Sequence, residues 1–370
     1  MVLSLLWYIF LGALGLQLLY YLLVFLRVAL PLKPSKETGT LPGVTILVCA
    51  HDEEENLKEL LPLLYEQDYP DFEVVVVDDR SNDNTYDFLL HEKEVQPKLN
   101  PVFVSNTPDY ANGKKWGLTL GIKAAKHEWV LLTDADCRPN SKEWIKEMAS
   151  GFTDENTFVL GYSPYYKNKG LLNAFIRFET LFVGLQYLGF ARSGLPYMGV
   201  GRNLAYRKSF FLEKKGFHDF FGLTGGDDDL WVNRHARRKN TQVVYNEKAI
   251  TWSIPEEKWS TYYRQKKRHL SVGKLYRFRD RFLLGGLALS HVLLWLLGIG
   301  LLAFPTLQLQ LAIAWGVRFL SQYLVFALAA RRLGYRFDLW LLPILDFLYL
   351  IYYFRVAMPA QFAKRVQWRN

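Results

Sequence analysis

Apolar residues concentrate at the two ends of the chain, whereas short apolar runs alternate with polar segments in between. Residues 2–26 contain no charged side chain, and about 20 apolar residues suffice for a helix to cross a bilayer. No basic segment precedes this run and no small-residue cleavage site follows it, which favours a retained anchor at residues 1–30 over a cleaved signal peptide. Further apolar runs lie near the C-terminus, at residues 282–303, 311–330 and 338–357. They predict a C-terminal membrane region of two to three helices within residues 282–370.

Basic residues at the ends of these runs predict how the chain is oriented. They are Arg27, Lys33 and Lys36, then Arg277, Arg279 and Arg281, and then Arg331, Arg332 and Arg336. By the positive-inside rule these groups are cytoplasmic, and the uncharged turn at residues 304–310 is outside. The pattern predicts a multi-pass membrane protein whose residues 40–280 form one domain on the cytoplasmic side. Lys364, Arg365 and Arg369 also favour the inside, so either the rule fails there or the last segment enters the membrane and returns.

Two of the C-terminal apolar runs carry a charged residue near their middle, Arg318 in one and Asp346 in the other. Each charge alone costs at least about 2.5–3.5 kcal/mol in the membrane. The turn between the two runs is short and basic, so the helices should pack antiparallel with their midpoints at similar depth. We therefore expect an Arg318–Asp346 pair. The alternative is that one side chain snorkels, or that Asp346 meets water in a re-entrant segment.

The middle of the chain has the pattern of an α/β domain. Short runs rich in β-branched residues are found at residues 44–50, 73–77, 102–104 and 129–133. Helical patterns separate them, one with Leu57, Leu60, Leu61 and Leu64 on a single face and another at about residues 114–126. Strands that alternate with helices pair in parallel, so the sequence predicts a doubly wound, mostly parallel sheet.

Carboxylates follow three of these predicted strands. They are Asp52, Glu53 and Glu54 after the first, Asp78 and Asp79 after the second, and Asp134 and Asp136 after the fourth. Ligands of such sheets bind outside the carboxyl ends of the strands. No glycine-rich loop follows the first strand, which argues against a dinucleotide fingerprint or a P-loop. Carboxylates next to a phosphate require a bridging cation, and Mg²⁺ or Mn²⁺ accepts such oxygen ligands. Alone, each motif is also compatible with an ordinary turn or helix cap.

Two charged clusters follow further along the chain. Asp227, Asp228 and Asp229 lie together at the predicted start of a helix, and residues 264–269 include four cations. The acidic cluster is compatible with a solvated cap, and the basic one with contacts to anionic lipid headgroups. Gln265 and Arg268 are three residues apart and therefore share a helix face. A basic cluster in this position also suits a diphosphate leaving group.

The composition narrows the class of protein. Hydrophobic residues make up 50% and aromatic residues 16% of the 370 residues, which excludes a disordered chain. Two cysteines are too few for a disulfide scaffold, and Cys49 and Cys137 are expected to be reduced thiols. The net charge is +9, but the basic residues line the membrane edges and the candidate site is acidic. Nucleic-acid binding is therefore disfavoured.

Taken in order, the motifs resemble those of the membrane-embedded, inverting family 2 glycosyltransferases with the GT-A fold. The resemblance covers about residues 44–274. It rests on the segments Val-Cys-Ala-His-Asp-Glu-Glu-Glu-Asn, Val-Val-Val-Asp78-Asp79-Arg-Ser, Gly113-Lys114-Lys115, Thr-Asp134-Ala-Asp136, Gly199-Val-Gly201-Arg202-Asn203, Gly-Asp227-Asp228-Asp229-Leu and Gln265-x-x-Arg268-His269. It implies transfer of a sugar from a nucleoside-diphosphate sugar, usually a uridine diphosphate sugar, with Mn²⁺ or Mg²⁺ as cofactor.

The resemblance also implies a role for each matching residue. The donor-binding set is Glu53, Asp78, Asp79, Lys114, Asp134, Gln265 and Arg268. Asp136, together with Asp134, is the implied metal ligand. Asp227 matches the catalytic base, and Asp228 is the alternative. The implied acceptor residues are Gly201, Arg202, Asn203 and His269.

Two departures from the family pattern affect the expected function. His269 stands where the family often has Trp, and Gly226-Asp227 stands where it more often has Glu-Asp. The first weakens the case for acceptor stacking and a polymerase role, and the second leaves Asp227 and Asp228 open as the base. The expected acceptor is a lipid-linked or membrane-proximal molecule. A helix at residues 171–190 could guide a lipid acceptor if it lies in the membrane interface rather than in the core. The rivals are a processive polysaccharide synthase and a non-catalytic nucleotide- or lipid-binding membrane protein.

Overall fold

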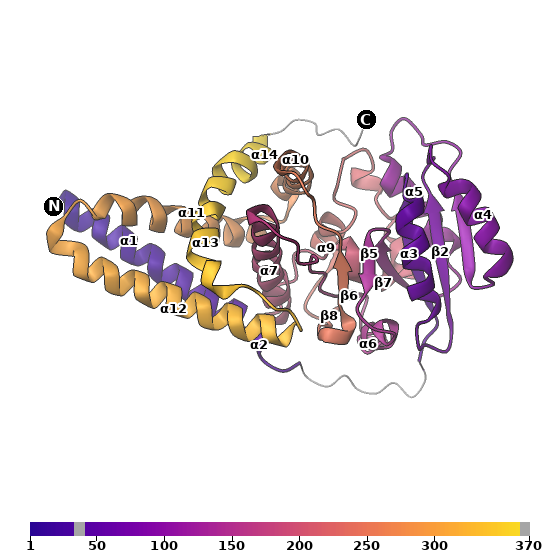
Figure 1. Ribbon diagram of the computed structural model, residues 1–370, viewed down its shortest axis with the longest axis horizontal. Coiled ribbons are helices and arrows are strands. Elements are labelled where there is room, and N and C mark those ends of the chain that lie inside the picture. The colour runs from indigo at the N-terminus through magenta and orange to yellow at the C-terminus, as the bar shows by residue number, and fades with distance from the viewer. Residues whose placement is uncertain (33–40, 363–370) are drawn as a thin grey trace. The chain divides into compact units, whose positions relative to one another are not determined.

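The computed structural model describes residues 1–32 and 41–362, so Lys33, Lys36 and the basic residues 364, 365 and 369 lie outside the described residues. The chain forms two compact units (Figure 1). An α/β unit contains residues 41–166 and 194–255, and a helical unit contains residues 1–31, 167–193 and 256–362. The predicted domain at residues 40–280 is thus interrupted, because residues 167–193 and 256–280 pack with the apolar helices.

A seven-stranded sheet forms the centre of the α/β unit, in the order β3-β2-β1-β4-β7-β6-β8. Its strands are β1 Val44–Ala50, β2 Phe72–Asp78, β3 Leu99–Phe103, β4 Trp129–Asp134, β6 Phe158–Leu160, β7 Leu204–Arg207 and β8 Thr241–Val243. The strands β1 to β4 pair in parallel, and β7 runs antiparallel to both β4 and β6. A second, two-stranded sheet pairs β5 Cys137–Pro139 with β9 Thr251–Ser253. The prediction of a mostly parallel α/β sheet is confirmed.

Helices connect and cover these strands. They are α3 Glu54–Tyr65, α4 Thr85–Val95, α5 Gly113–Ala124, α6 Trp144–Ala149, α8 Lys208–Glu213 and α9 Asp229–His235. The predicted leucine face of α3 is fully buried, and apolar residues of β1 and β2 join it in one core. The third strand begins three residues before its predicted start. Pro101 explains this difference, because proline interrupts the strand pattern and is tolerated at an edge strand such as β3.

The helical unit contains α1 and most of the C-terminal region. Its helices are α1 Val2–Leu19, α2 Leu26–Ala29, α7 Leu171–Arg192, α10 Trp259–Leu270, α11 Phe278–Leu301, α12 Gln308–Arg332, α13 Leu342–Tyr352 and α14 Met358–Phe362, with π-helical turns at Tyr20–Phe25 and Tyr353–Ala357. Among the described residues, four helical segments are long and apolar enough to cross a membrane: Val2–Ala29, Phe278–Leu301, Pro305–Arg332 and Leu339–Ala360. They coincide with the four apolar runs of the sequence.

The predicted intramembrane ion pair is present. Arg318 Nη2 lies 2.9 Å from Asp346 Oδ2, and both side chains are buried. Each oxygen of the Asp346 carboxylate also accepts a hydrogen bond from a neutral side chain. Gln322 Nε2 donates to Oδ1 at 2.7 Å, and Trp295 Nε1 donates to Oδ2 at 2.8 Å. The prediction of an Arg318–Asp346 pair is confirmed.

The helix α7 is buried on nearly all sides. Its charged residues Arg177 and Glu179 are buried as well, and each has an ionic partner inside the helical unit. Glu179 pairs with Lys266 at 2.6 Å, and Arg177 pairs with Asp338 at 3.2 Å. In this structure α7 is a core helix of the helical unit. Its role as a helix in the membrane interface that guides an acceptor stays a prediction.

Candidate active site

The sheet register aligns the acidic residues of the α/β unit at one edge. Ala50 at the end of β1 is opposite Asp78 on β2, and Cys49 is opposite Asp134 on β4. The carboxyl ends of three adjacent parallel strands are therefore level, as a ligand site of this fold requires. The sequence predicted this arrangement, because each strand is an apolar run that ends at a carboxylate.

Lys114 connects two of the acidic motifs. It lies in the first turn of α5, and its Nζ is 3.1 Å from Asp134 Oδ1 and 3.6 Å from Asp227 Oδ2. Burial by itself would lower the pKa of Lys114, but the negative charges of the surrounding carboxylates outweigh burial and raise that pKa. Lys114 is therefore a permanent cation between the end of β4 and the acidic loop.

The acidic loop before α9 is held by a second lysine that sequence reasoning did not select. Lys115 is fully buried, and its Nζ donates to the carbonyl oxygens of Leu223 and, at 2.5 Å, of Gly225. Gly225 and Gly226 both have positive φ angles, 86° and 87°, which glycine adopts without strain. The paired lysines in the sequence were the available signal, since two adjacent lysines at a helix start point in different directions.

Asp228 is the N-cap of α9 and is tightly oriented. Its Oδ1 accepts from the backbone N–H of Asp229 and its Oδ2 from that of Gly201, each at 2.7 Å. Burial, followed by the charge of Asp227, raises the pKa of Asp228 from 3.8 to about 6. The cluster thus contains one carboxylate beside a lysine and another that titrates close to neutral pH.

Asp136 is hydrogen-bonded to the two-stranded sheet formed by β5 and β9. Its Oδ2 accepts from Ser253 Oγ on β9 at 3.0 Å. Burial and the charge of Asp134 raise the pKa of Asp136, whereas the Arg202 guanidinium opposes that increase. Ser253 is another residue that sequence reasoning missed, because a single serine about 117 positions away carries no local signal.

Asp134 and Asp136 are the predicted metal ligands. The described part of the chain contains no group of three or more His, Cys, Asp and Glu residues arranged to hold a metal ion by itself. Asp134 and Asp136 nevertheless supply the hard oxygen atoms that Mg²⁺ and Mn²⁺ prefer. A cation would also relieve their mutual repulsion. The pair fits a divalent ion whose other ligands come from a bound phosphate or from water.

The predicted base- and ribose-binding residues form a compact turn after β2. The Oδ1 atom of Asp78 accepts from the backbone N–H of Ser81 at 3.1 Å, so this carboxylate stabilises the turn. Asp79 Oδ1 lies 2.9 Å from Arg80 Nε, and a Cβ atom on Gly113 would come within 2.5 Å of Asp79 Oδ2. A side chain at position 113 would therefore displace the Asp79 carboxylate from the start of α5. Glu53 accepts from Asn56 Nδ2 at 2.7 Å at the start of α3.

The predicted acceptor residues have different environments. Gly201 donates its N–H to Asp228, and Arg202 stacks on the Tyr165 ring with its guanidinium 4.3 Å from the ring centroid. Asn203 is fully buried and donates to the carbonyl oxygens of Tyr162 and Ala249. Asn203 therefore supports the loop from inside, and its predicted contact with an acceptor stays a prediction.

Gln265, Arg268 and His269 lie on α10 and belong to the helical unit, whereas the acidic motifs belong to the α/β unit. Arg268 Nη2 and His269 Nε2 are 3.4 Å apart. Gln265 Oε1 is buried and has no hydrogen-bond partner within the described ranges 1–32 and 41–362. The proposed diphosphate clamp stays a prediction.

The fold and the acidic sheet edge together define an α/β protein with a candidate ligand site at the carboxyl ends of its parallel strands. In a comparison with known proteins, the model of Glycosyl transferase family 2 matches residues 45–213. The chain therefore contains a family 2 glycosyltransferase domain with a GT-A fold, as the sequence motifs predicted.

Individual relatives are more distant. YdaM of Bacillus subtilis, named a probable glycosyltransferase, is 28% identical over 62% of this chain and 54% of its own length. The poly-β-1,6-N-acetyl-D-glucosamine synthase of Staphylococcus aureus is 22% identical over 71% of this chain and 62% of its own length. The chain thus spans between half and two thirds of these relatives. A solved mannosyltransferase of Pyrobaculum calidifontis, PcManGT in complex with GDP-Man and Mn²⁺, shares the fold with a TM-score of 0.61 at 19% identity, and the match covers 95% of this chain and 99% of PcManGT.

Proposed function

We propose that this protein is a membrane-bound glycosyltransferase that moves a sugar from a nucleoside-diphosphate sugar to a lipid-linked or membrane-proximal acceptor with inversion. The observation that carries the proposal is Lys114, which links the end of β4 to the acidic loop through Asp134 and Asp227. A donor site and a base are thereby held at one sheet edge. The α/β unit is proposed to face the cytoplasm, where nucleotide sugars are made.

The chemistry requires a base, an electrophile and stabilisation of the leaving group. Asp227 takes the proton of the attacking acceptor hydroxyl, with Asp228 as the alternative base. The base and ribose of a uridine donor lie at Asp79, and Gln265 and Arg268 hold the departing diphosphate. One displacement inverts the anomeric carbon, so no covalent nucleophile is needed.

A divalent ion held by Asp134 and Asp136 would supply charge stabilisation for the leaving diphosphate. Lys114 holds Asp134 through an ion pair and remains charged at all working pH values. Arg202 adds positive charge near Asp136 and limits the cost of keeping that carboxylate ionised.

The second candidate is a processive polysaccharide synthase. It is supported by the resemblance to the poly-β-1,6-N-acetyl-D-glucosamine synthase and opposed by His269 in place of the family's Trp. Product length separates the two, since a single transfer gives one added sugar and a synthase gives a ladder. A non-catalytic binding protein is the third, and it would need neither Asp136 nor Asp227 in place.

A donor screen tests the proposal. Membranes containing the full chain are given UDP-glucose, UDP-N-acetylglucosamine or GDP-mannose, and release of the nucleoside diphosphate is followed with Mn²⁺ and with excess chelator. We expect release from one donor that needs the ion and disappears in Asp136→Ala. Full activity in chelator would exclude the metal, and no release with any donor, at wild-type folding, would favour the binding protein.

A further inference from the structure

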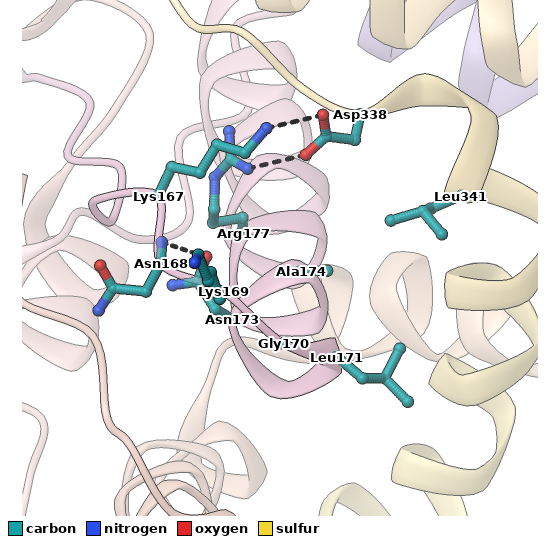
Figure 2. Close-up of a pocket in the computed structure, with 10 residues that line it drawn as sticks. All are labelled: Lys167, Asn168, Lys169, Gly170, Leu171, Asn173, Ala174, Arg177, Asp338 and Leu341. Atoms are coloured by element: carbon teal, nitrogen blue, oxygen red, sulfur yellow. Dashed lines mark hydrogen bonds and ion pairs between the residues drawn. The ribbon is translucent and has the colours of Figure 1, made fainter.

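A pocket of about 830 Å³ lies within the helical unit at the start of α7 (Figure 2). We call it the α7 pocket. Its basic lining residues are Lys167, Lys169 and Arg177, and its acidic lining residue is Asp338. Leu171, Ala174 and Leu341 contribute apolar surface. Three cations and one carboxylate leave the lining with an excess of positive charge, which favours an anionic ligand.

The single carboxylate binds two of the three cations. Lys167 Nζ lies 2.9 Å from Asp338 Oδ1, and Arg177 Nη1 lies 3.2 Å from Asp338 Oδ2 (Figure 2). The two basic side chains therefore converge from the α7 side on one point. Asp338 occupies that point as an internal anion and keeps both cations in place.

Arg177 has donor capacity that this arrangement does not use. The residue is only 3% exposed, and its Nε is buried without a hydrogen-bond partner among the residues that the structure describes. A buried guanidinium N–H without an acceptor is unfavourable, and an anion in the adjoining pocket would stabilise the positive charge of Arg177. The beginning of the 22-residue α7 adds to the effect, because Gly170 provides no side-chain cap and the first turn contains no acidic residue.

The pocket also lies at the polar end of a candidate membrane span. Asp338 and Leu341 flank the start of the segment Leu339–Ala360. Trp340 is 76% exposed, and tryptophan at the end of a span is typical of the headgroup layer. Leu171 on α7 is half exposed. The pocket therefore combines cations with an apolar rim at the depth where lipid phosphates occur.

We propose that the α7 pocket binds the phosphate group of a membrane lipid, with Lys167, Lys169 and Arg177 around the phosphate and the leucines against its first methylene groups. The phosphate can belong to a lipid-phosphate acceptor or to a bilayer phospholipid. The acceptor version rests on the proposed function, whereas the phosphate site itself does not.

Native mass spectrometry of the detergent-purified full chain tests the proposal. The probes are polyprenyl phosphate, the matching polyprenol, phosphatidylglycerol and inorganic phosphate. We expect the double variant Lys167→Gln/Lys169→Gln to bind polyprenyl phosphate or phosphatidylglycerol about tenfold to thirtyfold more weakly. The matched control Arg331→Gln/Arg332→Gln removes two exposed cations at the end of α12 and should change binding less than about twofold.

A third variant separates ligand binding from damage to the fold. Asp338→Asn removes the internal anion that competes with the phosphate, so it should tighten binding, whereas partial unfolding would weaken it. Equal losses in both double variants, or polyprenol binding as tightly as polyprenyl phosphate, would overturn the proposal. Displacement of phosphatidylglycerol by polyprenyl phosphate would assign the site to the acceptor, and the reverse preference to bilayer lipid.

The binding measurement uses no sugar donor, so its result is independent of turnover. Lipid binding without nucleotide release from any donor would contradict the proposed function and leave the α7 pocket intact. Turnover that is insensitive to all three variants, together with unchanged lipid binding, would contradict the pocket and leave the proposed function intact.

Discussion

Each unit places a cation against carboxylates, but the balance of charge differs. In the α/β unit, Lys114 meets Asp134 and Asp227, and Asp228 and Asp136 lie close by, so negative charge is in excess. In the helical unit, Asp346 meets Arg318, and two neutral donors satisfy its remaining lone pairs.

The difference indicates separate purposes. In a balanced pair such as Arg318–Asp346 each buried charge compensates the other, so the loss of either partner alone destabilises the helical unit. An excess of carboxylates lowers the stability of the folded chain, because their negative charges repel one another. A bound cation would relieve this repulsion, so the acidic site favours cation binding at the expense of stability. Mutations should therefore affect turnover at the first cluster and folding at the second.

The largest effect is expected for Asp227→Asn. The amide cannot accept the acceptor's proton, so turnover should fall by roughly two to four orders of magnitude, while the donor still binds because Lys114 and Asp134 are unchanged. Initial rates and donor affinity of the full chain measure the two quantities. Asp228→Asn serves as the matched variant, and a larger loss there than in Asp227→Asn would make Asp228 the base.

The next effect concerns the helical unit. Arg318→Met and Asp346→Leu should each destabilise the protein by about 3–5 kcal/mol, because each leaves one buried charge without its partner. The double variant should lose clearly less than the sum of the two. Thermal unfolding in detergent measures the cycle, and strictly additive losses would show that the pair contributes no coupling.

A smaller effect is expected for Lys115→Met. The variant keeps the length of the side chain but leaves the carbonyl groups of Leu223 and Gly225 without their donor, at a cost of about 1–3 kcal/mol. The acidic loop should loosen, and turnover should fall about tenfold with little change in donor affinity. Lys123→Met on the exposed side of the same helix is the control. An unchanged rate in Lys115→Met would mean that the loop is held by other contacts.

The sequence predicted most of what depends on local pattern. The strands β1, β2 and β4 are continuous apolar runs. Acidic residues follow their carboxyl ends, and parallel pairing places these residues at one edge of the sheet. Arg318 and Asp346 were predictable because a charge inside a membrane has few available partners. The antiparallel strands β6 and β7 were not predicted, since each has only three or four residues. Lys115 and Ser253 were missed because their partners are distant in sequence.

The interruption of the α/β domain was also beyond local pattern. The helix α7 is apolar on nearly every face, which is compatible with a soluble core as well as with a membrane unit. Its distant partners, among them Lys266 for Glu179 and Asp338 for Arg177, place it with the other helices. The residues of these pairs are 87 and 161 positions apart in the sequence. The hydrophobic periodicity of the sequence cannot predict such distant pairs.

The smallest expected effect is a change in the pH dependence of stability in Asp228→Asn. The pKa of Asp228 is about 6 in the folded chain, against 3.8 as the ordinary value. Well below pH 3.8 the carboxyl is protonated in both the folded and the unfolded chain, so it costs nothing. Between pH 3.8 and about 6 the unfolded chain releases this proton while the folded chain still holds it, so stability falls as the pH rises and the loss is complete above about pH 6.

The asparagine variant cannot ionise at this position, so it escapes that loss. Its melting temperature relative to the unsubstituted protein should therefore improve by a few degrees between pH 4.5 and pH 7.5. The slope is the relevant quantity, because asparagine can also lose one of the two backbone hydrogen bonds, which lowers stability equally at every pH. Asp219→Asn, at an exposed carboxylate of the same unit, is the control and should show no such slope. If the difference in melting temperature between Asp228→Asn and the unsubstituted protein stays constant across this range, Asp228 titrates normally. The contrast between an acidic site with excess negative charge in one unit and a balanced ion pair in the other would then rest on Lys114 and Asp136 alone.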